Sequence, residues 1–233
     1  IVGTRGEQDG FELLVPVVPH RKLTLETGTH PISMRVLDLL TPMGKGQRPL
    51  IVAPPRTGKT NLLRDIRVSL SKNHPEVRQI VLLVDERPEQ VAEIRGNSDA
   101  EVFELSSFRD AESNVRLIET VVAQAKHLAV TGKDVYLELD SVTEMIHAIS
   151  SQTESRSEQR NQESSHSIDA TALNTAKRMF DIGRQFRDSG SITVCATVLV
   201  DRGRNLDQVV FEKFKGPGTM ELVLIRELAA HRI

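Results

Sequence analysis

The stretch LIVAPPRTGKTNLL, Leu50 to Leu63, decides the fold. It opens with four apolar residues, typical of a buried strand, and ends in a segment with helical spacing. In the loop between them, Gly58, Lys59 and Thr60 match the end of the phosphate-loop pattern Gly-x-x-x-x-Gly-Lys-Ser/Thr. Ala53 stands where this pattern has its first glycine. A loop that joins a strand to a helix N-terminus in this way is expected to hold a phosphate.

Each residue type in this loop has a physical role in nucleotide binding. Backbone N–H groups at the helix start point at phosphate oxygens, and the helix dipole favours the anion. The Lys59 ammonium is expected to reach the β and γ phosphates, and the Thr60 hydroxyl to hold magnesium. The motif therefore predicts ATP and Mg²⁺ as cofactors. The structural alternative is an ordinary glycine turn with a surface lysine.

The composition excludes several classes of protein. A formal net charge of -2 over 233 residues gives no global basic field, so nucleic-acid binding would need a local basic site. Cys195 is the one cysteine, which excludes an intramolecular disulfide and fits a reducing cytoplasm. Within ITVCATVLV it is expected to be a core residue. No apolar run approaches the roughly 20 residues that span a bilayer, so we expect a cytoplasmic protein without a membrane partner.

Apolar runs alternate with helical segments along the chain, which predicts an α/β fold. Most of the runs are continuous and rich in Val, Ile and Leu, as in a parallel sheet that is covered on both faces. We therefore predict a doubly wound, mostly parallel twisted sheet with helices on both faces. The predicted strands are Leu50–Ala53, Ile80–Val84, Val135–Leu139, Ile192–Val200 and Met220–Ile225, and the predicted helices are Asn61–Ser71, Asn114–Thr131 and Thr171–Arg187.

Two segments fall outside this alternation. Residues 1–33 are rich in Pro and Gly and are predicted to be a linker or lead-in, in which IVGT, residues 1–4, is typical of the last strand of a preceding domain. This leaves 34–233 as the nucleotide-binding domain. Residues 150–167 are polar and contain no apolar side chain, so they are predicted to form a mobile loop. Composition leaves open whether this loop is a surface insertion or one that orders on a ligand or partner.

Acidic residues follow two of the predicted strands, where ligands of open parallel sheets bind. DERPEQV follows Ile80–Val84, and in it Glu86 could polarise an attacking water while Arg87 holds a phosphate. DSVTE follows Val135–Leu139, and its Asp140 is predicted to hold magnesium directly or through water. The structural alternatives are a salt-bridged loop and a helix cap.

The segment after Ile192–Val200, DRGRNLDQVVFEKFKGPGTM, is predicted to be a second flexible element. Its Gly216, Pro217 and Gly218 would form a tight loop that presents Lys215. A single lysine on such a loop is usually just solvated. Several copies in a ring pore would instead grip a phosphodiester backbone.

Several segments together closely resemble the RecA-like ATPase domain of the transcription termination factor Rho family. They are RVLDLLTPMGKGQRPLIVAPPRTGKT, VLLVDERPEQVAEI, DVYLELDSVT, SIDATAL, ITVCATVLVDRG and FEKFKGPGTMEL. The resemblance extends from about Phe11 to Ile233, with the motifs in the same order as in the family. APPRTGKT, without a leading glycine, is also the form of the phosphate loop in that family. The resemblance implies a RecA-like P-loop NTPase core in a homo-hexameric, ATP-driven RNA translocase. Such a motor moves 5′ to 3′ on single-stranded RNA and acts on the RNA polymerase transcription complex.

The resemblance also assigns roles to residues by position. Glu86 is the implied catalytic carboxylate, acting with Lys59 and Asp140, and Asp140 and Thr60 are the implied magnesium ligands. Arg87 is implied as a nucleotide contact, as are Gly44, Lys45, Gly46, Gln47, Arg48, Pro49, Arg56, Thr57, Gly58 and Asn61.

Further roles follow for the C-terminal part. Lys215, with Gly216 and Gly218, is implied to contact RNA, and Arg232 to sense nucleotide near the subunit interface. The chain stops at Ile233, before the family's adenine-stacking aromatic residue and arginine finger. This piece alone is therefore expected to bind ATP weakly and to hydrolyse it slowly, because a missing finger costs about 10³-fold or more.

Some positions depart from the family pattern. Glu144 and His147 stand where the family usually has arginines, Pro49 replaces a glycine, and the long polar run replaces a shorter glycine-rich loop. An alternative hypothesis is therefore a divergent Rho-like subunit with a regulatory or assembly role and little translocation. Another ring ATPase on the same fold, such as a rotary ATPase subunit or a DNA recombinase, is disfavoured by DERPE and FKGPG.

Overall fold

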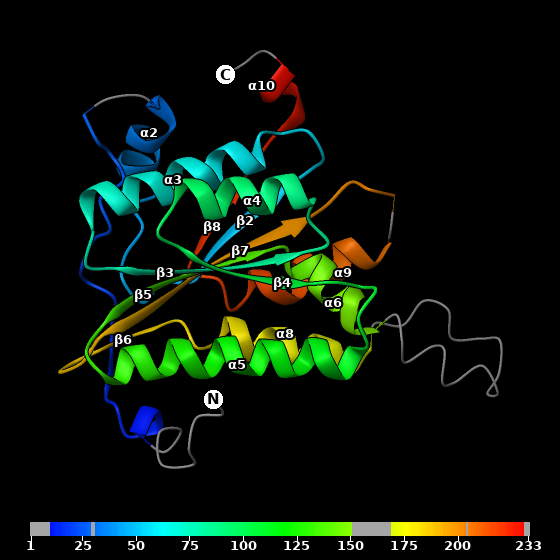
Figure 1. Cartoon of the computed structure of the whole chain (residues 1–233). Helices are drawn as coiled ribbons and strands as arrows, with labels where there is room; N and C mark the ends of the chain where they lie inside the picture. The colour runs from blue at the N-terminus through cyan, green and yellow to red at the C-terminus, as the bar shows by residue number, and fades with distance from the viewer. Residues whose placement is uncertain (1–9, 29–30, 151–168, 204, 231–233) are drawn as a thin grey trace.

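One sheet organises the protein in a computed structural model, which describes residues 10–28, 31–150, 169–203 and 205–230 (Figure 1). Six parallel strands run in the spatial order β8-β2-β7-β5-β3-β4. Two short strands, β1 and β6, add an antiparallel extension beside the start of β7. The strands are β1 Pro16–Val17, β2 Pro49–Ala53, β3 Arg78–Val84, β4 Glu101–Leu105, β5 Asp134–Asp140, β6 Arg184–Phe186, β7 Ser191–Leu199 and β8 Met220–Val223.

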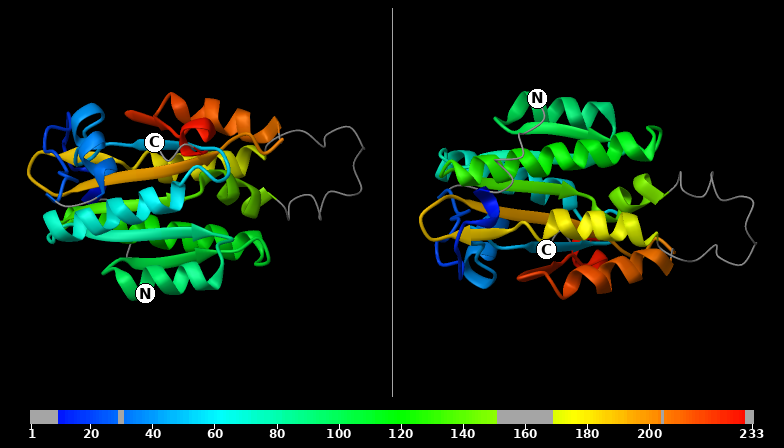
Figure 2. Two further views of the ribbon diagram at one scale, coloured as in Figure 1. Left: turned by 90° about the horizontal axis from the view of Figure 1, so that it is seen from above. Right: turned by 90° about the horizontal axis from the view of Figure 1, so that it is seen from below.

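Helices cover both faces of this sheet, as the views from above and below show (Figure 2). One face carries α2, α3 and α4, and the opposite face carries α5, α6, α8 and α9. The described helices are α2 Ile32–Leu40, α3 Lys59–Asn73, α4 Pro88–Asn97, α5 Ala111–Val130, α6 Val142–Ser150, α8 Ala170–Phe180, α9 Asn205–Lys215 and α10 Arg226–Ala230. The predicted fold class, a mostly parallel α/β sheet with helices on both faces, is confirmed.

Both faces of the central strands are buried, which explains their continuous apolar runs. Along β3, Ile80 and Leu82 enter the core under α5, whereas Val81 and Leu83 face α4. The same alternation on β5 turns Tyr136 toward α3. A periodicity of two in side-chain direction therefore fixes which residues of each strand can reach the helix that follows the phosphate loop.

The predicted helix Thr171–Arg187 is wrong beyond Phe180. Helix α8 ends at Phe180, and residues 184–186 form β6, antiparallel to β7. Gly183 lies between the two elements, and a Cβ on this residue would approach Arg48 Cγ to 2.6 Å. The chain therefore turns back toward the sheet at a position where no larger residue fits.

The predicted flexible element after β7 is also corrected, because residues 205–215 form helix α9. Val210 and Phe214, four residues apart, are fully buried against the sheet. Phe214 also packs edge-on against Phe180 of α8, with ring centroids 5.4 Å apart. Apolar spacing of four residues in DQVVFEKFK is the signal that predicts this helix.

The described part of the lead-in packs on the domain. Phe11 is buried and meets Phe186 of β6 at 5.1 Å, and Leu23 and Leu25 join the core beside α2 and α3. Residues 1–9, including the IVGT segment, lie outside the described residues. The domain boundary at residue 33 stays a prediction. Among the described helices, none has the length and apolar character to cross a membrane.

Candidate active site

The loop from Pro54 to Gly58 connects β2 to α3 at the carboxyl edge of the sheet. Its glycine, Gly58, caps α3 with φ 86°, a left-handed conformation that favours glycine. The Thr57 hydroxyl donates a 2.8 Å hydrogen bond to the Pro54 carbonyl across the loop. These features shape a loop whose backbone leads directly into a helix N-terminus, the geometry that binds anions.

Three strand ends bring an ammonium and two carboxylates together at this edge. Lys59 Nζ donates a hydrogen bond to Asp140 Oδ1 and lies 3.8 Å from Glu86 Oε1. Asp140 ends β5 and Glu86 follows β3, its parallel neighbour. Parallel strands end at one edge, so side chains far apart in sequence meet there.

The surroundings of Glu86 change its acidity. Burial, and next the negative charge of Asp140, raise the pKa of Glu86 above its ordinary value, while Lys59 opposes the shift. A carboxylate with a raised pKa is a better proton acceptor, which suits a general base for water. Glu86 also lines a 410 Å³ hollow between the ends of β3 and β4, bordered by Leu105 and Phe108. The hollow gives this carboxylate an open side.

Asp140 is held in place from the neighbouring strand. Its Oδ1 accepts a 2.7 Å hydrogen bond from the Thr197 hydroxyl on β7 and a second from Lys59. The donor set at this edge, the Asp140 carboxylate and the exposed Thr60 hydroxyl, consists of hard oxygen atoms. Mg²⁺ prefers such oxygens and completes its shell with water and phosphate, so these residues fit magnesium. In the described residues no cluster of three or more His, Cys, Asp or Glu offers an all-protein metal cage.

The remaining candidates near the phosphate loop are exposed. Arg56 lies in the loop with φ 65°, and Asn61 lies on the first turn of α3. Arg87 follows Glu86 directly and is the N-cap residue of α4. The structure therefore places these three side chains around the same edge as Lys59.

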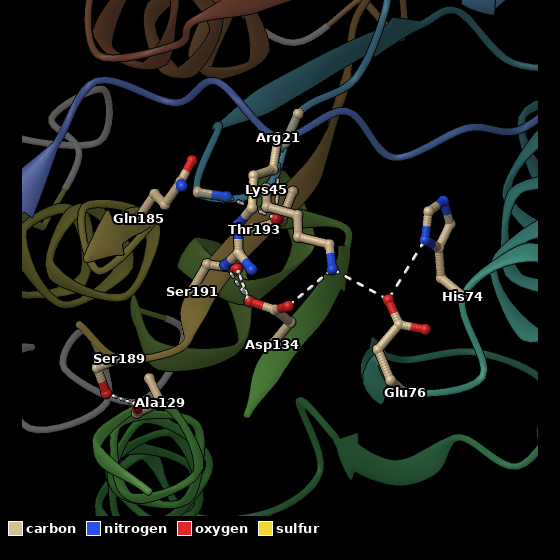
Figure 3. Close-up of polar contacts among 12 residues, drawn as sticks. Arg21, Lys45, His74, Glu76, Ala129, Asp134, Gln185, Ser189, Ser191 and Thr193 are labelled. Atoms are coloured by element: carbon tan, nitrogen blue, oxygen red, sulfur yellow. Dashed lines mark hydrogen bonds and ion pairs between the residues drawn. The ribbon is translucent and has the colours of Figure 1, made fainter. Parts of the chain in front are cut away.

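The segment Gly44–Pro49 lies elsewhere, at the amino edge of the sheet. Residues 44–48 precede β2 and Pro49 is its first residue, whereas the phosphate loop follows β2. The five extended residues of β2 span about 16 Å. Lys45 is bound to Asp134, the first residue of β5, at 2.7 Å, and to Glu76 at 3.0 Å (Figure 3). The segment therefore lies at the opposite edge of the sheet from the phosphate loop, and its role as a nucleotide contact stays a prediction.

The same amino edge carries a polar network that sequence reasoning missed (Figure 3). Asp134 also accepts hydrogen bonds from Arg21 at 2.8 Å and from Ser191 at 2.7 Å. Gly46 approaches β6 so closely that a Cβ would lie 2.3 Å from Gln185 N, and its φ is 86°. The network therefore fastens the lead-in and the loop before β2 to the start of β5.

Lys215, the predicted RNA contact, is the last residue of α9 and has an exposed side chain. Its Nζ lies 4.0 Å from a Glu221 carboxylate oxygen and 5.4 Å from the Phe211 ring centroid. Residues 216–218 precede β8 and so belong to the amino edge, away from the phosphate loop. Arg232 and residues 151–168 lie outside the described residues.

A charge cluster beside the carboxyl edge was also missed. Arg202 forms two hydrogen bonds to buried Asp207, at 2.9 and 2.7 Å, and a third to Glu144. His147 Nε2 lies 3.9 Å from Asp207. The cluster joins α6, which follows Asp140, to α9. Glu144 and His147 are conspicuous in the sequence, but no local pattern identifies Arg202 as their partner.

The phosphate loop, the parallel order of the strands and the converging Lys59, Glu86 and Asp140 define a nucleotide-binding ATPase core of the RecA-like kind. The family described as ATP synthase alpha/beta family, nucleotide-binding domain, matches residues 33–233, and the chain belongs to this family. Within this family, the chain is similar to transcription termination factors named Rho, as the motifs predicted. A transcription termination factor Rho from Haemophilus influenzae is 42% identical over 226 residues, which cover 96% of this chain and 53% of the relative.

Other relatives agree. A transcription termination factor Rho from Streptomyces coelicolor is 42% identical over 98% of this chain and 54% of its own length. One from Akkermansia muciniphila is 43% identical over 96% of this chain and 46% of its own. The chain thus spans about half the length of these relatives.

A solved structure, a prototypical ATPase from the type III secretion system of pathogenic bacteria, matches with a TM-score of 0.72. At 23% identity, covering 94% of this chain and 60% of that one, it shows the fold alone.

Proposed function

We propose that this chain is the ATP-hydrolysing motor domain of a Rho-type RNA translocase. It would couple ATP hydrolysis to movement on nascent RNA and to release of the transcript. The observation that carries the proposal is the meeting of Lys59, Glu86 and Asp140 at the carboxyl edge, next to the phosphate loop. The names of the relatives at about 40% identity support the assignment to transcription termination.

The chemistry follows from the positions of the side chains. The Lys59 ammonium exchanges the Asp140 carboxylate for the β and γ phosphate oxygens of ATP. Asp140 and the Thr60 hydroxyl are then free to hold Mg²⁺, which when bound neutralises charge on the phosphates. Glu86 orients a water for in-line attack on the γ phosphorus and takes its proton, a role that its raised pKa favours.

RNA binding is proposed for the exposed Lys215 and its neighbours Gly216 and Gly218. One ammonium gives little affinity, but copies of Lys215 around a homo-hexameric ring would line a basic path for a phosphodiester backbone. Single-stranded RNA and the RNA polymerase transcription complex are the proposed partners. The proposed place of action is the cytoplasm.

The decisive experiment measures steady-state ATP hydrolysis by the full-length protein with and without poly-cytidine RNA. We expect RNA to raise turnover and Glu86→Gln to lower kcat by about 10²-fold or more while the Kd for Mg–ATP stays within threefold. ATP binding without RNA-stimulated turnover in the wild type would instead support the regulatory subunit, for which Glu144 and His147 argue. Unchanged kcat in the Glu86 variant would exclude this residue as the base.

A further inference from the structure

A second ion pair joins the same helix and strand as Lys59 and Asp140, but deeper in the molecule. Arg67 of α3 donates a hydrogen bond from Nη1 to Glu138 Oε1 of β5. Both residues are buried, with 4% and 0% of their surface exposed. The alternation along β5 turns Glu138 and Asp140 to the same face, which α3 covers. Two ion pairs therefore connect α3 to β5.

Stability alone does not account for this buried pair. Two charges removed from water cost several kcal/mol each, and apolar residues of similar volume often stabilise such a site as well or better. Here the compensation is incomplete, because Glu138 Oε2 has no hydrogen-bond partner among the described residues. What the pair adds over apolar side chains is direction: a hydrogen bond fixes two atoms, whereas apolar contact is non-directional.

The direction matters because most of the remaining contacts of α3 with the core are apolar. The described exceptions lie away from Lys59: Gln79 of β3 donates hydrogen bonds to the Arg67 carbonyl at 3.2 Å and to Ser71 Oγ at 2.8 Å. Leu63, Ile66 and Leu70 attach the helix to the sheet and tolerate small shifts along or around its axis. Arg67 lies eight residues, or about 12 Å, along the helix from Lys59. Arg67 is too far into the core to take part in phosphate binding. Its ion pair with Glu138 is therefore kept when Lys59 leaves the Asp140 carboxylate and binds the phosphates of a nucleotide.

We propose that Arg67 and Glu138 are positioning residues for ATP hydrolysis, which keep Lys59 in register with Asp140 during that exchange. The inference rests on the proposed function, since it concerns the same site. A helix free to shift by 1 Å would misplace the Lys59 ammonium relative to the transferred phosphoryl group, and errors of this size cost up to about 10²-fold in rate.

The test replaces the pair by apolar residues of similar volume, Arg67→Met with Glu138→Leu. We expect the double variant to unfold at the wild-type temperature or above, and its kcat to fall tenfold or more while KM changes less than threefold. Affinity for Mg–ADP with fluoroaluminate, which mimics the transferred phosphoryl group, should fall tenfold or more, and affinity for Mg–ADP alone less than threefold. Arg67→Lys, which keeps the cation, should retain kcat within threefold.

A matched control removes an ion pair away from the site. Glu112 and Arg116 pair at 2.7 Å on the exposed side of α5, and their double alanine variant should match the wild type in every assay. A folded Arg67→Met/Glu138→Leu variant with wild-type kcat and fluoroaluminate affinity would overturn the inference. Failure of this variant to fold would assign the pair to stability and also overturn it.

The outcome is separable from that of the proposed function. A wild type without RNA-stimulated turnover would defeat the motor proposal, yet the fluoroaluminate comparison would still decide the role of Arg67 and Glu138. A wild type that does not bind Mg–ADP would overturn both.

Discussion

Lys59 and Asp140 lie 81 positions apart in the sequence and form a hydrogen-bonded ion pair. Lys59 follows the loop after β2, and Asp140 is the last residue of β5. Both strands pair with β7 in parallel, so all three end at one edge of the sheet and the two side chains can meet there. The contact brings opposite charges to the place where an ATP-dependent enzyme needs them. The pair also keeps the Asp140 carboxylate, which is only 6% exposed, electrically compensated.

Lys59→Ala removes this cation from the phosphate loop. Because a hydrogen bond to a charged group contributes about 1.5–3 kcal/mol, we expect Mg–ATP binding to weaken by about tenfold or more. Titration calorimetry measures the effect, with Lys72→Ala, near the far end of the same helix, as a control. Equal affinities for the Lys59 variant and the wild type would contradict the assignment of the loop.

The raised pKa of Glu86 predicts an acid limb in the pH dependence of turnover. The carboxyl must be ionised to accept a proton, so kcat/KM should fall as the pH drops through the pKa of Glu86, above the ordinary value of 4.5. Steady-state rates between pH 4.5 and 8 locate this limb. The residual activity of Glu86→Gln should lack it, and an identical limb in that variant would point to another group.

Glu138 predicts how stability changes with pH. Burial raises its pKa from 4.5 to about 7, against the attraction of Arg67. The folded state thus binds the proton more tightly than the unfolded state does. This contribution to stability is fully present below pH 4.5 and is lost as the pH rises to about 7. Urea unfolding at several pH values measures it. The difference between the wild type and Arg67→Met/Glu138→Leu isolates it, and parallel curves would exclude it.

Arg202 and Glu144 should differ in their importance for stability. Arg202→Met leaves the buried Asp207 without its guanidinium, which is expected to lower the free energy of unfolding by about 3 kcal/mol. Glu144→Gln affects a partly exposed side chain and should cost less than about 1 kcal/mol. Urea unfolding at pH 7 compares the two. Equal losses would show that Asp207 does not depend on Arg202.

The central sheet could be predicted because its information is local. Continuous apolar runs mark strands such as Leu50–Ala53, and every predicted strand overlaps a strand of the structure, although the runs that end at Val200 and Ile225 extend one and two residues beyond β7 and β8. Strand β4 was missed because only Leu105 of Glu101–Leu105 is buried, as befits a strand at the sheet edge. The helix predicted through Arg187 failed where a tertiary contact, the pairing of β6 with β7, overrode local spacing.

The candidate site, like the fold, has parts that the sequence predicts and parts that depend on tertiary contacts. Order along the chain placed Lys59, Glu86 and Asp140 at strand ends, and parallel topology brings such ends together. Their catalytic roles stay a prediction. The segment Gly44–Pro49 shows the limit: it lies close to the phosphate loop in sequence, but strand β2 carries the chain to the opposite edge of the sheet between them. Pairs such as Arg202 with Glu144 depend on side chains 58 positions apart and have no local signature.

The polar network at the start of β5 has a mechanical consequence. Arg21 of the lead-in forms an ion pair with Asp134, the first residue of β5, and Asp140 is the last residue of the same strand. An extended, hydrogen-bonded strand in the middle of a sheet resists stretching and bending. A pulling force on the lead-in is therefore transmitted along β5, over about 23 Å, to the Asp140 carboxylate that faces Lys59.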